Sequence, residues 1–467
     1  MLWLDVDVDV TGNGPVDRRA GRGGFVGDGQ TPGRRTDPWT AQAGAGGRIE
    51  GFASDGAVAP GEAVDFRITV DPPREFRVDV YRVGHYGGAG AHRLTASPTL
   101  PGMVQPEPLV AGRTVSCHHW WRSWRLPVPP SWRCGAYVAQ LTTVDGARGH
   151  VPFTVRSLPP AGEPGPEEPT AATSPPVADL LVVLPDITWQ AYNSYPEQEL
   201  PPGVRDAPMT VSFDRPYAGT GVPPFAGHAH GFIRWAERYG YDLAYAEARD
   251  LHAGRVAASH YRGLVFPGHD EYWTAPMRAA VREARDQGTS LVFLSAGSLA
   301  GHADLDPSPS GEPHRLLTCR GRRRHRGGSG REAGDPEQAL LGIQHAGPVP
   351  EPAPLVVRNA GHWLWEATGA EEGDLLPGLV AGCADRYFPR TSLPEYRERI
   401  LLTHSPYRDA RGARRHQETS LYRAPSGALV FASGTSAWSP ALDRSGRAES
   451  TVQRATANLL DRICKGD

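Results

Sequence analysis

The sequence predicts a multidomain α/β plus all-β protein, in which a β-sandwich precedes an α/β part built on a mostly parallel sheet. Apolar and polar residues alternate with period two in the N-terminal half, as in strands with one buried face. After a proline-rich stretch, continuous apolar runs alternate with segments of helical period, as in parallel sheets covered by helices. The length of 467 residues also exceeds that of one ordinary domain.

The predicted β-sandwich spans residues 47–157. Apolar residues alternate over 64–70 and, after a Pro-Pro turn, over 76–80. Two further alternating segments follow at 137–141 and 151–155, each set off by turn residues. One apolar face per strand is typical of two antiparallel sheets packed together, so we expect an immunoglobulin-like β-sandwich.

Two segments of biased composition flank the sandwich. Residues 1–46 are rich in Gly, Arg, Asp and Pro without periodicity, and we expect a disordered arm there. Residues 158–177 contain a dense set of prolines, which predicts an extended, semi-rigid linker.

The predicted α/β part spans residues 178–467. Short, continuous apolar runs indicate strands that are buried on both faces of a sheet, whereas apolar residues at helical spacing indicate helices between them. The predicted strands are 180–184, 264–266, 291–294 and 429–432, and the predicted helices are 232–239, 277–284 and 452–463. Strand, helix and strand in this order form βαβ units, which place neighbouring strands parallel.

Composition excludes several classes of partner. The net charge of -3 gives no general attraction to nucleic acid or to an anionic membrane, and we expect the basic run over 320–326 to be a solvated loop. The N-terminus lacks a basic segment followed by an apolar one, and no apolar run is long enough to span a membrane. We therefore expect a cytoplasmic protein without a membrane or nucleic-acid partner.

The cysteines do not indicate a metal knuckle or a disulfide-rich scaffold. There are 5 of them, widely spaced and without a C-x-x-C pair. Cys117 and Cys134 both fall in the predicted sandwich, and the sequence leaves open whether they pair.

Polar side chains follow two of the predicted parallel strands. Tyr192 lies after the strand over 180–184, and His269 and Glu271 lie after the strand over 264–266. Ligands bind outside the carboxyl ends of strands in open α/β sheets, so these side chains are expected to converge. Phenolate and carboxylate are hard oxygen donors suited to a highly charged cation. A metal or acid/base site is therefore one interpretation, and a capping or ion-paired loop with a packed tyrosine is the other.

Several longer motifs resemble a known family. They are YRVGHYGG at 81–88, CGAY at 134–137, TWQAYN at 188–193, SFDRPY at 212–217, GHDEYW at 268–273, and SGT at 433–435 with Trp438. These motifs resemble the large (beta) subunit of N,N-dimethylformamidase and its actinobacterial relatives. The resemblance runs from about residue 48 to the C-terminus.

The resemblance implies a fold, a reaction and a cofactor. The family's type enzyme hydrolyses a small formamide to an amine and formate with a mononuclear ferric iron held by two tyrosines and a glutamate. Its sheet resembles the glutamine-amidotransferase-like α/β fold without the nucleophilic cysteine. Carried over by motif, Glu271 and Tyr192 would be metal ligands and His269 would position or deprotonate the attacking water. Tyr137 is the candidate second phenolate, with Tyr272 as the alternative.

The sequence also departs from the family pattern. Relatives have an asparagine where this chain has Gly297, and a glutamate where it has Cys383. Losing an amide and a carboxylate from one pocket would weaken transition-state stabilisation. The expected function is therefore an iron-dependent hydrolase of a small amide, and the alternative is a catalytically impaired paralogue that binds a ligand or partner. A metal-free hydrolase of the same fold ranks last, because no nucleophile is apparent.

The resemblance also bears on partners. The type enzyme pairs its large chain with a small helical subunit, and nothing in this sequence indicates a need for one. The identity of the small-molecule substrate and a homo-oligomeric state are left open.

Overall fold

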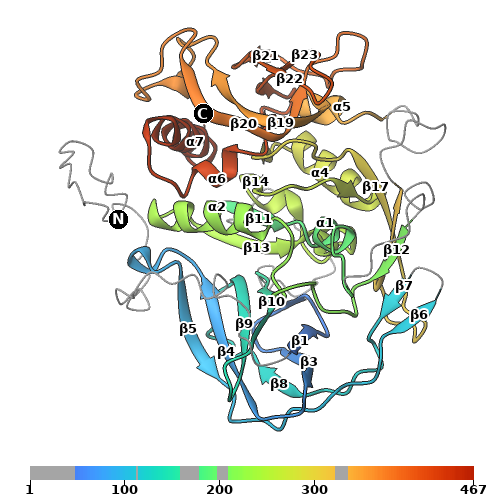
Figure 1. Ribbon diagram of the computed structural model, residues 1–467. Helices are drawn as coiled ribbons and strands as arrows, with labels where there is room; N and C mark the ends of the chain where they lie inside the picture. The colour runs from blue at the N-terminus through green and yellow to red at the C-terminus, as the bar shows by residue number, and fades with distance from the viewer. Residues whose placement is uncertain (1–47, 112–113, 158–177, 197–208, 321–334, 467) are drawn as a thin grey trace, which may run out of the picture.

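The structure, a computed structural model, describes residues 48–111, 114–157, 178–196, 209–320 and 335–466. The predicted arm over 1–46, the predicted linker over 158–177 and nearly all of the basic run lie outside the described residues. Figure 1 shows three layers: a β-sandwich at the bottom, an α/β sheet with its helices in the middle, and a group of long strands at the top.

The β-sandwich consists of two sheets. Their strands, in spatial order, are β1 (Arg48–Ala53), β3 (Ala63–Asp71) and β8 (Trp124–Pro127) in one sheet, and β2 (Ala57–Val58), β10 (Arg148–Val155), β9 (Gly135–Thr143), β4 (Phe76–Val83) and β5 (Ala91–Ala96) in the other. Alternate residues such as Phe66 and Ile68 of β3 and Val78 and Val80 of β4 are buried in one shared core. The four sandwich strands predicted from the sequence are confirmed and are each somewhat longer than predicted.

The middle layer is a seven-stranded mixed sheet. Its strands, in spatial order, are β13 (Leu243–Glu247), β11 (Leu180–Leu184), β14 (Gly263–Phe266), β16 (Ser290–Phe293), β25 (Leu429–Ala432), β24 (Ser420–Arg423) and β21 (Glu398–Leu401). The first five strands pair in parallel, and the last two pair antiparallel. All four predicted strands of this part are confirmed, so the carboxyl ends of the parallel strands lie along one edge.

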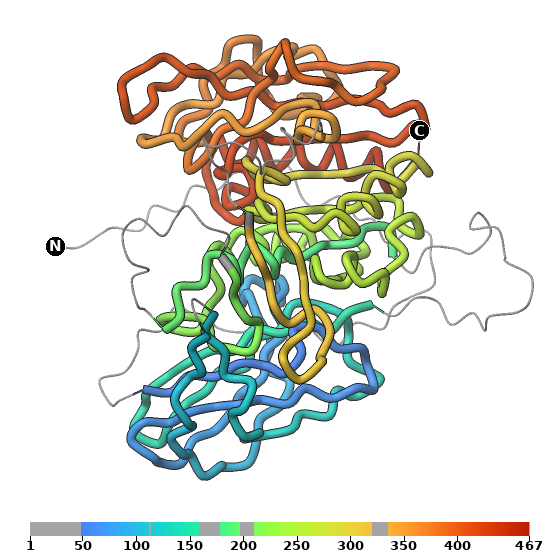
Figure 2. Tube along the Cα trace, turned by 90° about the vertical axis from the view of Figure 1, so that its right-hand side faces the viewer, coloured from blue at the N-terminus to red at the C-terminus, as the bar shows by residue number. Residues whose placement is uncertain are grey.

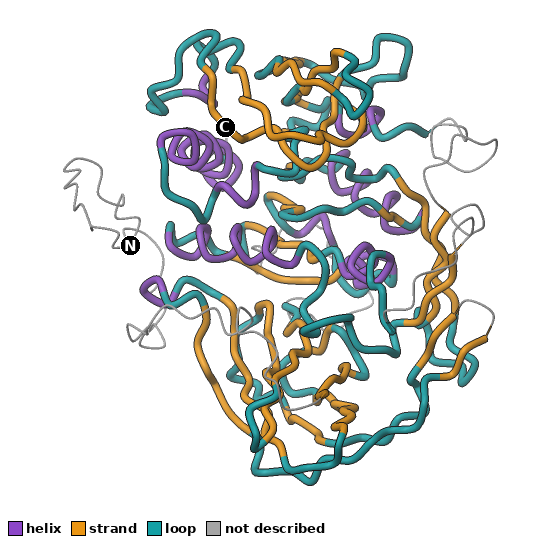
Figure 3. Tube along the Cα trace, in the orientation of Figure 1, coloured by secondary structure: helices purple, strands orange, loops and turns teal. Residues whose placement is uncertain are grey.

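Helices cover both faces of this sheet. Leu180, Val182 and Leu184 of β11 face the core that includes α2 (Ala226–Arg238) and α7 (Arg447–Lys465). The alternate residues of β11 face the opposite core, which includes α4 (Ala275–Asp286). Burial on both faces explains why the strand is apolar at every position. Figure 3 shows the helices gathered mainly in this middle layer.

Further strands and helices complete the fold. The remaining strands are β6 (Leu109–Ala111), β7 (Thr114–Ser116), β12 (Met209–Ser212), β15 (Tyr272–Trp273), β17 (Gly301–Asp306), β18 (Leu316–Arg320), β19 (Gln344–Val356), β20 (Leu375–Arg386), β22 (Ser405–Arg408) and β23 (Arg414–Gln417). The remaining helices are α1 (Asp186–Ala191), α3 (Ala248–His252), α5 (Gln338–Leu341), α6 (Trp438–Ala441) and the 3-10 turns η1 (Tyr86–Gly88), η3 (Ala258–His260) and η4 (Trp363–Trp365). Figure 2 shows β17 and β18, in yellow and orange, reaching from the middle layer down toward the sandwich.

The sandwich packs directly on the α/β part. The buried ion pair between Arg82 of β4 and Glu237 of α2 has a separation of 2.6 Å. The Ser157 amide donates to the Tyr245 carbonyl at 3.1 Å, which extends the sandwich chain onto β13. Val138 of β9 also belongs to the core that contains α2. Polar and apolar contacts together therefore fix the sandwich against the sheet.

Cys117 and Cys134 do not form a disulfide in the structure. Cys117 lies in a small buried cluster with Trp120, whereas the Cys134 thiol donates to the Leu243 carbonyl at 3.5 Å. Among the described helices, none is both long and apolar enough to cross a bilayer.

Candidate functional site

Three of the predicted site residues meet at one carboxylate oxygen. The Tyr192 hydroxyl donates to Oε2 of Glu271, and Nε2 of His269 lies 3.3 Å from the same oxygen. Tyr192 caps the end of α1, which follows β11, while the other two lie just after β14. Because β11 and β14 pair in parallel, their exits lie side by side. The prediction that these exits converge is confirmed, and we call these three residues the sheet-exit cluster.

The tautomer of His269 is fixed by its second nitrogen. Nδ1 lies 3.2 Å from the Ala296 carbonyl oxygen, which can only accept a hydrogen bond, so Nδ1 carries the hydrogen. In the neutral imidazole, Nε2 then presents a lone pair to Oε2 of Glu271. Two lone pairs at this separation repel unless a proton or another cation lies between them. The sheet-exit cluster therefore favours a bound cation or a shared proton.

Aromatic rings wall the sheet-exit cluster. The ring centroid of Phe225 lies 5.3 Å from that of Tyr192 and 5.0 Å from that of His269. The ring of Tyr272 lies near the cluster as well, with its centroid 6.2 Å from that of Tyr192. Glu271 is 3% exposed but Tyr192 is 43% exposed, so the cluster is buried at its base and open at the tyrosine. A small molecule would enter from the Tyr192 side.

A second histidine lies behind the aromatic wall. His228, in the first turn of α2, has its ring centroid 6.0 Å from that of Phe225. Burial and, to a smaller extent, the nearby His269 together lower the pKa of His228 to about 4. This imidazole is therefore neutral near pH 7.

The buried carboxylate of Asp385 accepts hydrogen bonds from the turn that follows β16, the strand next to β14. The Gly297 amide, in the turn after β16, donates to both carboxylate oxygens of Asp385, at 2.9 and 3.1 Å. His345 lies opposite Asp385 on the β19–β20 ribbon, with Nδ1 3.5 Å from the carboxylate. This contact holds the turn that carries the Ala296 carbonyl, and through it the ring of His269. Our sequence analysis gave Asp385 no role, because its partner lies 88 positions away and no local pattern links them.

Tyr137, the candidate second phenolate, lies elsewhere. It is on the inward face of β9 and is 1% exposed, in the core of the sandwich. Its hydroxyl donates to the Arg133 carbonyl at 2.5 Å, and its ring stacks on Trp132 with centroids 5.3 Å apart. The structure does not bring Tyr137 to the sheet-exit cluster. Tyr272, the alternative named from the sequence, is the tyrosine that lies beside Tyr192.

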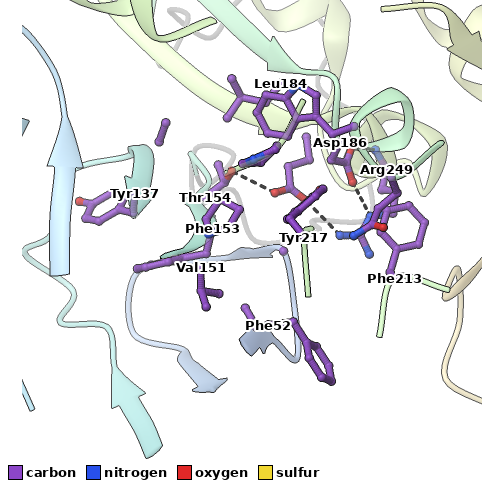
Figure 4. A pocket seen from close by; sticks show the side chains of 18 of the residues that line it. Phe52, Tyr137, Val151, Phe153, Thr154, Leu184, Asp186, Phe213, Tyr217 and Arg249 are labelled. Atoms are coloured by element: carbon purple, nitrogen blue, oxygen red, sulfur yellow. Dashed lines mark hydrogen bonds and ion pairs between the residues drawn. The ribbon is translucent and has the colours of Figure 1, made fainter. Parts of the chain in front are cut away.

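A cavity of about 50 Å³ lies between the sandwich and the sheet. Arg249 lies at its edge and forms ion pairs with Asp186 and Glu247, and Thr154 donates to Glu247 at 3.1 Å. Figure 4 shows Asp186, Arg249 and Phe213 gathered on one side of the cavity, with Tyr137 set apart from them. The carboxylates of Asp186 and Glu247 are both paired with Arg249, and the lining does not include the sheet-exit cluster. We interpret it as part of the interface between the sandwich and the sheet.

The fold and the site define a class of protein, in which a β-sandwich supports an α/β sheet with a polar cluster at its strand exits. A family model described as N,N-dimethylformamidase beta subunit-like, C-terminal, matches residues 77–453, which is most of the chain. The chain therefore belongs to this family, as its motifs predicted. A search of curated proteins found no match.

Proposed function

We propose that this chain is an iron-dependent hydrolase that cleaves the C–N bond of a small, uncharged amide. One observation carries the proposal: Tyr192 and His269 converge on a single oxygen of buried Glu271. Membership of the N,N-dimethylformamidase-like family supports an amide as the substrate class. The apolar walls formed by Phe225 and Tyr272 suit an uncharged molecule.

The donor set of the sheet-exit cluster fits a ferric ion. A phenol and a carboxylate are hard oxygen donors, and a bound cation lowers the pKa of a phenol so that it can act as a ligand. A cation held by Glu271 would also relieve the repulsion between the lone pairs of Nε2 of His269 and Oε2 of Glu271, which lie 3.3 Å apart. Tyr192 and Glu271 would hold the ion. Tyr272 is our proposal for the second phenolate in place of Tyr137, whose hydroxyl is bonded inside the sandwich.

The chain's own residues would orient the substrate and move one proton. When bound, iron would supply Lewis-acid polarisation of the amide carbonyl. His269 would take a proton from the attacking water at Nε2 while Nδ1–H stays bonded to the Ala296 carbonyl. The same nitrogen would then return the proton to the departing amine. Asp385 holds the turn at Gly297 and so keeps the ring of His269 in place.

We also propose a domain division and a fold for each domain. We infer an immunoglobulin-like domain over 47–157 and an amidotransferase-like domain over 178–467. Tyr137 supports the first assignment, because a tyrosine at a strand start that bonds back to the main chain is a feature of such sandwiches. The run of parallel strands covered on both faces supports the second.

A second candidate function is ligand or partner binding without catalysis. Gly297 and Cys383 favour it, because relatives place an amide and a carboxylate at these positions. Asp385 lies two residues from Cys383 on β20 and bonds to Gly297 itself. A buried carboxylate is therefore still present beside the Gly297 turn, and we infer that catalysis is the better supported function.

The proposal is tested by assaying the iron-loaded chain with N,N-dimethylformamide and other small formamides and measuring formate release. Glu271→Gln is expected to lose bound iron and at least about 1000-fold in kcat/KM, because the carboxylate charge is removed. A matched control is Asp304→Asn, since His302 and Asp304 have the same spacing along the chain and the same 3.3 Å separation on a more exposed strand. Binding of formamides without formate release would favour the second candidate function.

A further inference from the structure

A second group of potential metal ligands lies outside the sheet-exit cluster, at the base of the β22–β23 hairpin. His404, His416 and Glu418 each offer a ligand atom, and these atoms all lie within 4.8 Å of one another. We call these residues the hairpin cluster. It belongs to the upper layer of Figure 1, where β22 and β23 lie beside β19 and β20.

The pairing of the two strands explains why the three side chains share a face. Ser405 pairs with Gln417, so in the antiparallel register His404 comes opposite Glu418. His416 and Glu418 are two positions apart and so point to the same side. Gln417 points to the other side, where its side chain bonds to Thr403, Ser405 and Thr419. This buried hydrogen-bond network fixes the orientation of the hairpin base.

One carboxylate oxygen of Glu418 is held in place and the other faces the histidines. Oε2 accepts a hydrogen bond from the Tyr387 amide at 2.8 Å, and the Glu418 side chain is only 9% exposed. Oε1 lies 3.2 Å from Nδ1 of His404 and 3.8 Å from Nε2 of His416. The two imidazole rings lie side by side, with centroids 4.5 Å apart. A fixed carboxylate and two converging imidazoles constitute three ligands with a supporting contact.

We propose that the hairpin cluster binds a divalent transition-metal ion of the Zn²⁺ type. Ligand atoms of a tetrahedral zinc ion lie about 3.4 Å apart when each bond is about 2.1 Å. The separations of 3.2 and 3.8 Å are close to this value, and all three ligand atoms lie within 4.8 Å of one another. The side chain of His404 is 48% exposed, so its ring can rotate toward the other two ligands. Three protein ligands leave a fourth position for water.

The donor types distinguish this site from the sheet-exit cluster. Imidazole nitrogens suit zinc and similar divalent ions, whereas a phenol with a carboxylate suits a harder trivalent ion. The hairpin ion would join β22, β23 and, through Glu418, the Tyr387 end of β20. Because the ligands meet only in the folded hairpin, zinc binding would stabilise this layer.

The test uses the full-length chain without an affinity tag, freed of metal with a chelator. Zn²⁺ binding is measured by equilibrium dialysis with elemental analysis, and Co²⁺ is added in parallel for its visible tetrahedral bands. We expect one tightly bound Zn²⁺ at the hairpin and strong Co²⁺ bands. His416→Ala and, as an independent variant, His404→Gln should weaken zinc binding by about 100-fold or more and remove the bands.

Two controls separate this proposal from the function proposed above. His302→Gln removes a histidine that pairs with a single carboxylate and should leave zinc binding unchanged. Glu271→Gln should abolish iron binding at the sheet-exit cluster and leave zinc binding at the hairpin intact. Absence of zinc binding at micromolar concentration, or equal affinity in the folded His416→Ala and His404→Gln variants, would overturn the proposal.

Discussion

The sheet-exit cluster and the hairpin cluster contain the same three-residue pattern, His-x-Glu, in two different settings. His269 and Glu271 lie after a parallel strand, with Nε2 and Oε2 3.3 Å apart. His416 and Glu418 lie at the end of an antiparallel hairpin, with Nε2 and Oε1 3.8 Å apart. A tyrosine completes the first set, and a second histidine, His404, completes the second.

The difference between the clusters shows that the short motif does not determine the chemistry. The third residue, Tyr192 in one cluster and His404 in the other, decides whether the set is rich in oxygen or in nitrogen. Burial is similar, since each cluster has a buried glutamate and one half-exposed side chain, Tyr192 at 43% and His404 at 48%. The two clusters therefore differ in donor type rather than in access to solvent.

The largest expected effect comes from replacing the histidine of each His-x-Glu pattern with glutamine and comparing the two variants. His269→Gln should reduce kcat for formamide hydrolysis by about 1000-fold, because the residue that takes the proton is removed. It should keep iron, since our ligand assignment does not include His269. His416→Gln should keep kcat within about twofold and lose zinc. Similar kcat losses in both variants would show that the two clusters act as one site.

A smaller effect should come from the tyrosines. Tyr192→Phe removes the phenol that donates to Glu271, and we expect kcat/KM to fall by about 100-fold and the iron-phenolate band to weaken. Tyr272→Phe tests the second phenolate in the same assay. Tyr137→Phe is the control: it should leave colour and rate unchanged and lower the free energy of unfolding by about 1 kcal/mol through loss of its hydrogen bond. Colour loss in Tyr137→Phe would restore it as a ligand.

A buried histidine in α2, His230, should make the free energy of unfolding depend on pH. Burial lowers the pKa of His230 from 6.5 to about 3, so this residue stays neutral in the folded state. Between these two values the unfolded chain binds more protons, and stability therefore falls as the pH falls. The slope is about 1.4 kcal/mol per pH unit, or about 2 kcal/mol between pH 6 and 4.5.

His230→Gln should flatten this part of the stability profile, as measured by denaturant unfolding at several pH values. An unchanged slope in His230→Gln would show that another group carries the pH dependence.

The smallest expected effect concerns Asp385, which lies between the two clusters. Its carboxylate accepts from Gly297, and its main-chain carbonyl accepts from the Glu418 amide at 2.9 Å. Asp385→Asn should lower kcat/KM by about 10-fold, because a weaker acceptor loosens the turn that holds His269. Zinc binding at the hairpin should not change, since the main-chain contact is kept. If Asp385→Asn weakened zinc binding and left kcat/KM unchanged, the Asp385 side chain would support the hairpin cluster and not His269.

A glycine keeps the two clusters close together. The main-chain amide of Asp385 donates to the Gly434 carbonyl at 2.9 Å. Gly434 has a φ of 66°, and a Cβ added there would lie 2.1 Å from the Glu418 carbonyl oxygen. Only glycine therefore permits this approach of the main chain. The SGT motif, noticed in the sequence without a role, gains a structural one.

The sequence predicted the sheet-exit cluster because simple rules govern its parts. Continuous apolar runs identified β11 and β14, and parallel strands bring their exits together. The assignment of Tyr137 relied on motif resemblance alone. Its alternation with Ala139 and Leu141 already placed it on the inward face of a strand, and the structure confirms that burial.

Other parts of the site could not be predicted from local patterns. Asp385 reaches Gly297 only because the long β19–β20 ribbon folds back over the sheet. The hairpin cluster depends on the register of β22 and β23, and a shift of one residue would turn Glu418 to the other face. Such long-range pairings are set by tertiary packing rather than by the neighbouring residues.

The visible absorption spectrum of the iron-loaded protein tests the central claim most directly. The account predicts a broad iron-phenolate band in the unmodified chain, which is weakened in Tyr192→Phe, lost in Glu271→Gln together with the iron, and kept in His416→Ala. A colourless iron-loaded protein, or a band that is unchanged in Tyr192→Phe and disappears in His416→Ala, would contradict it.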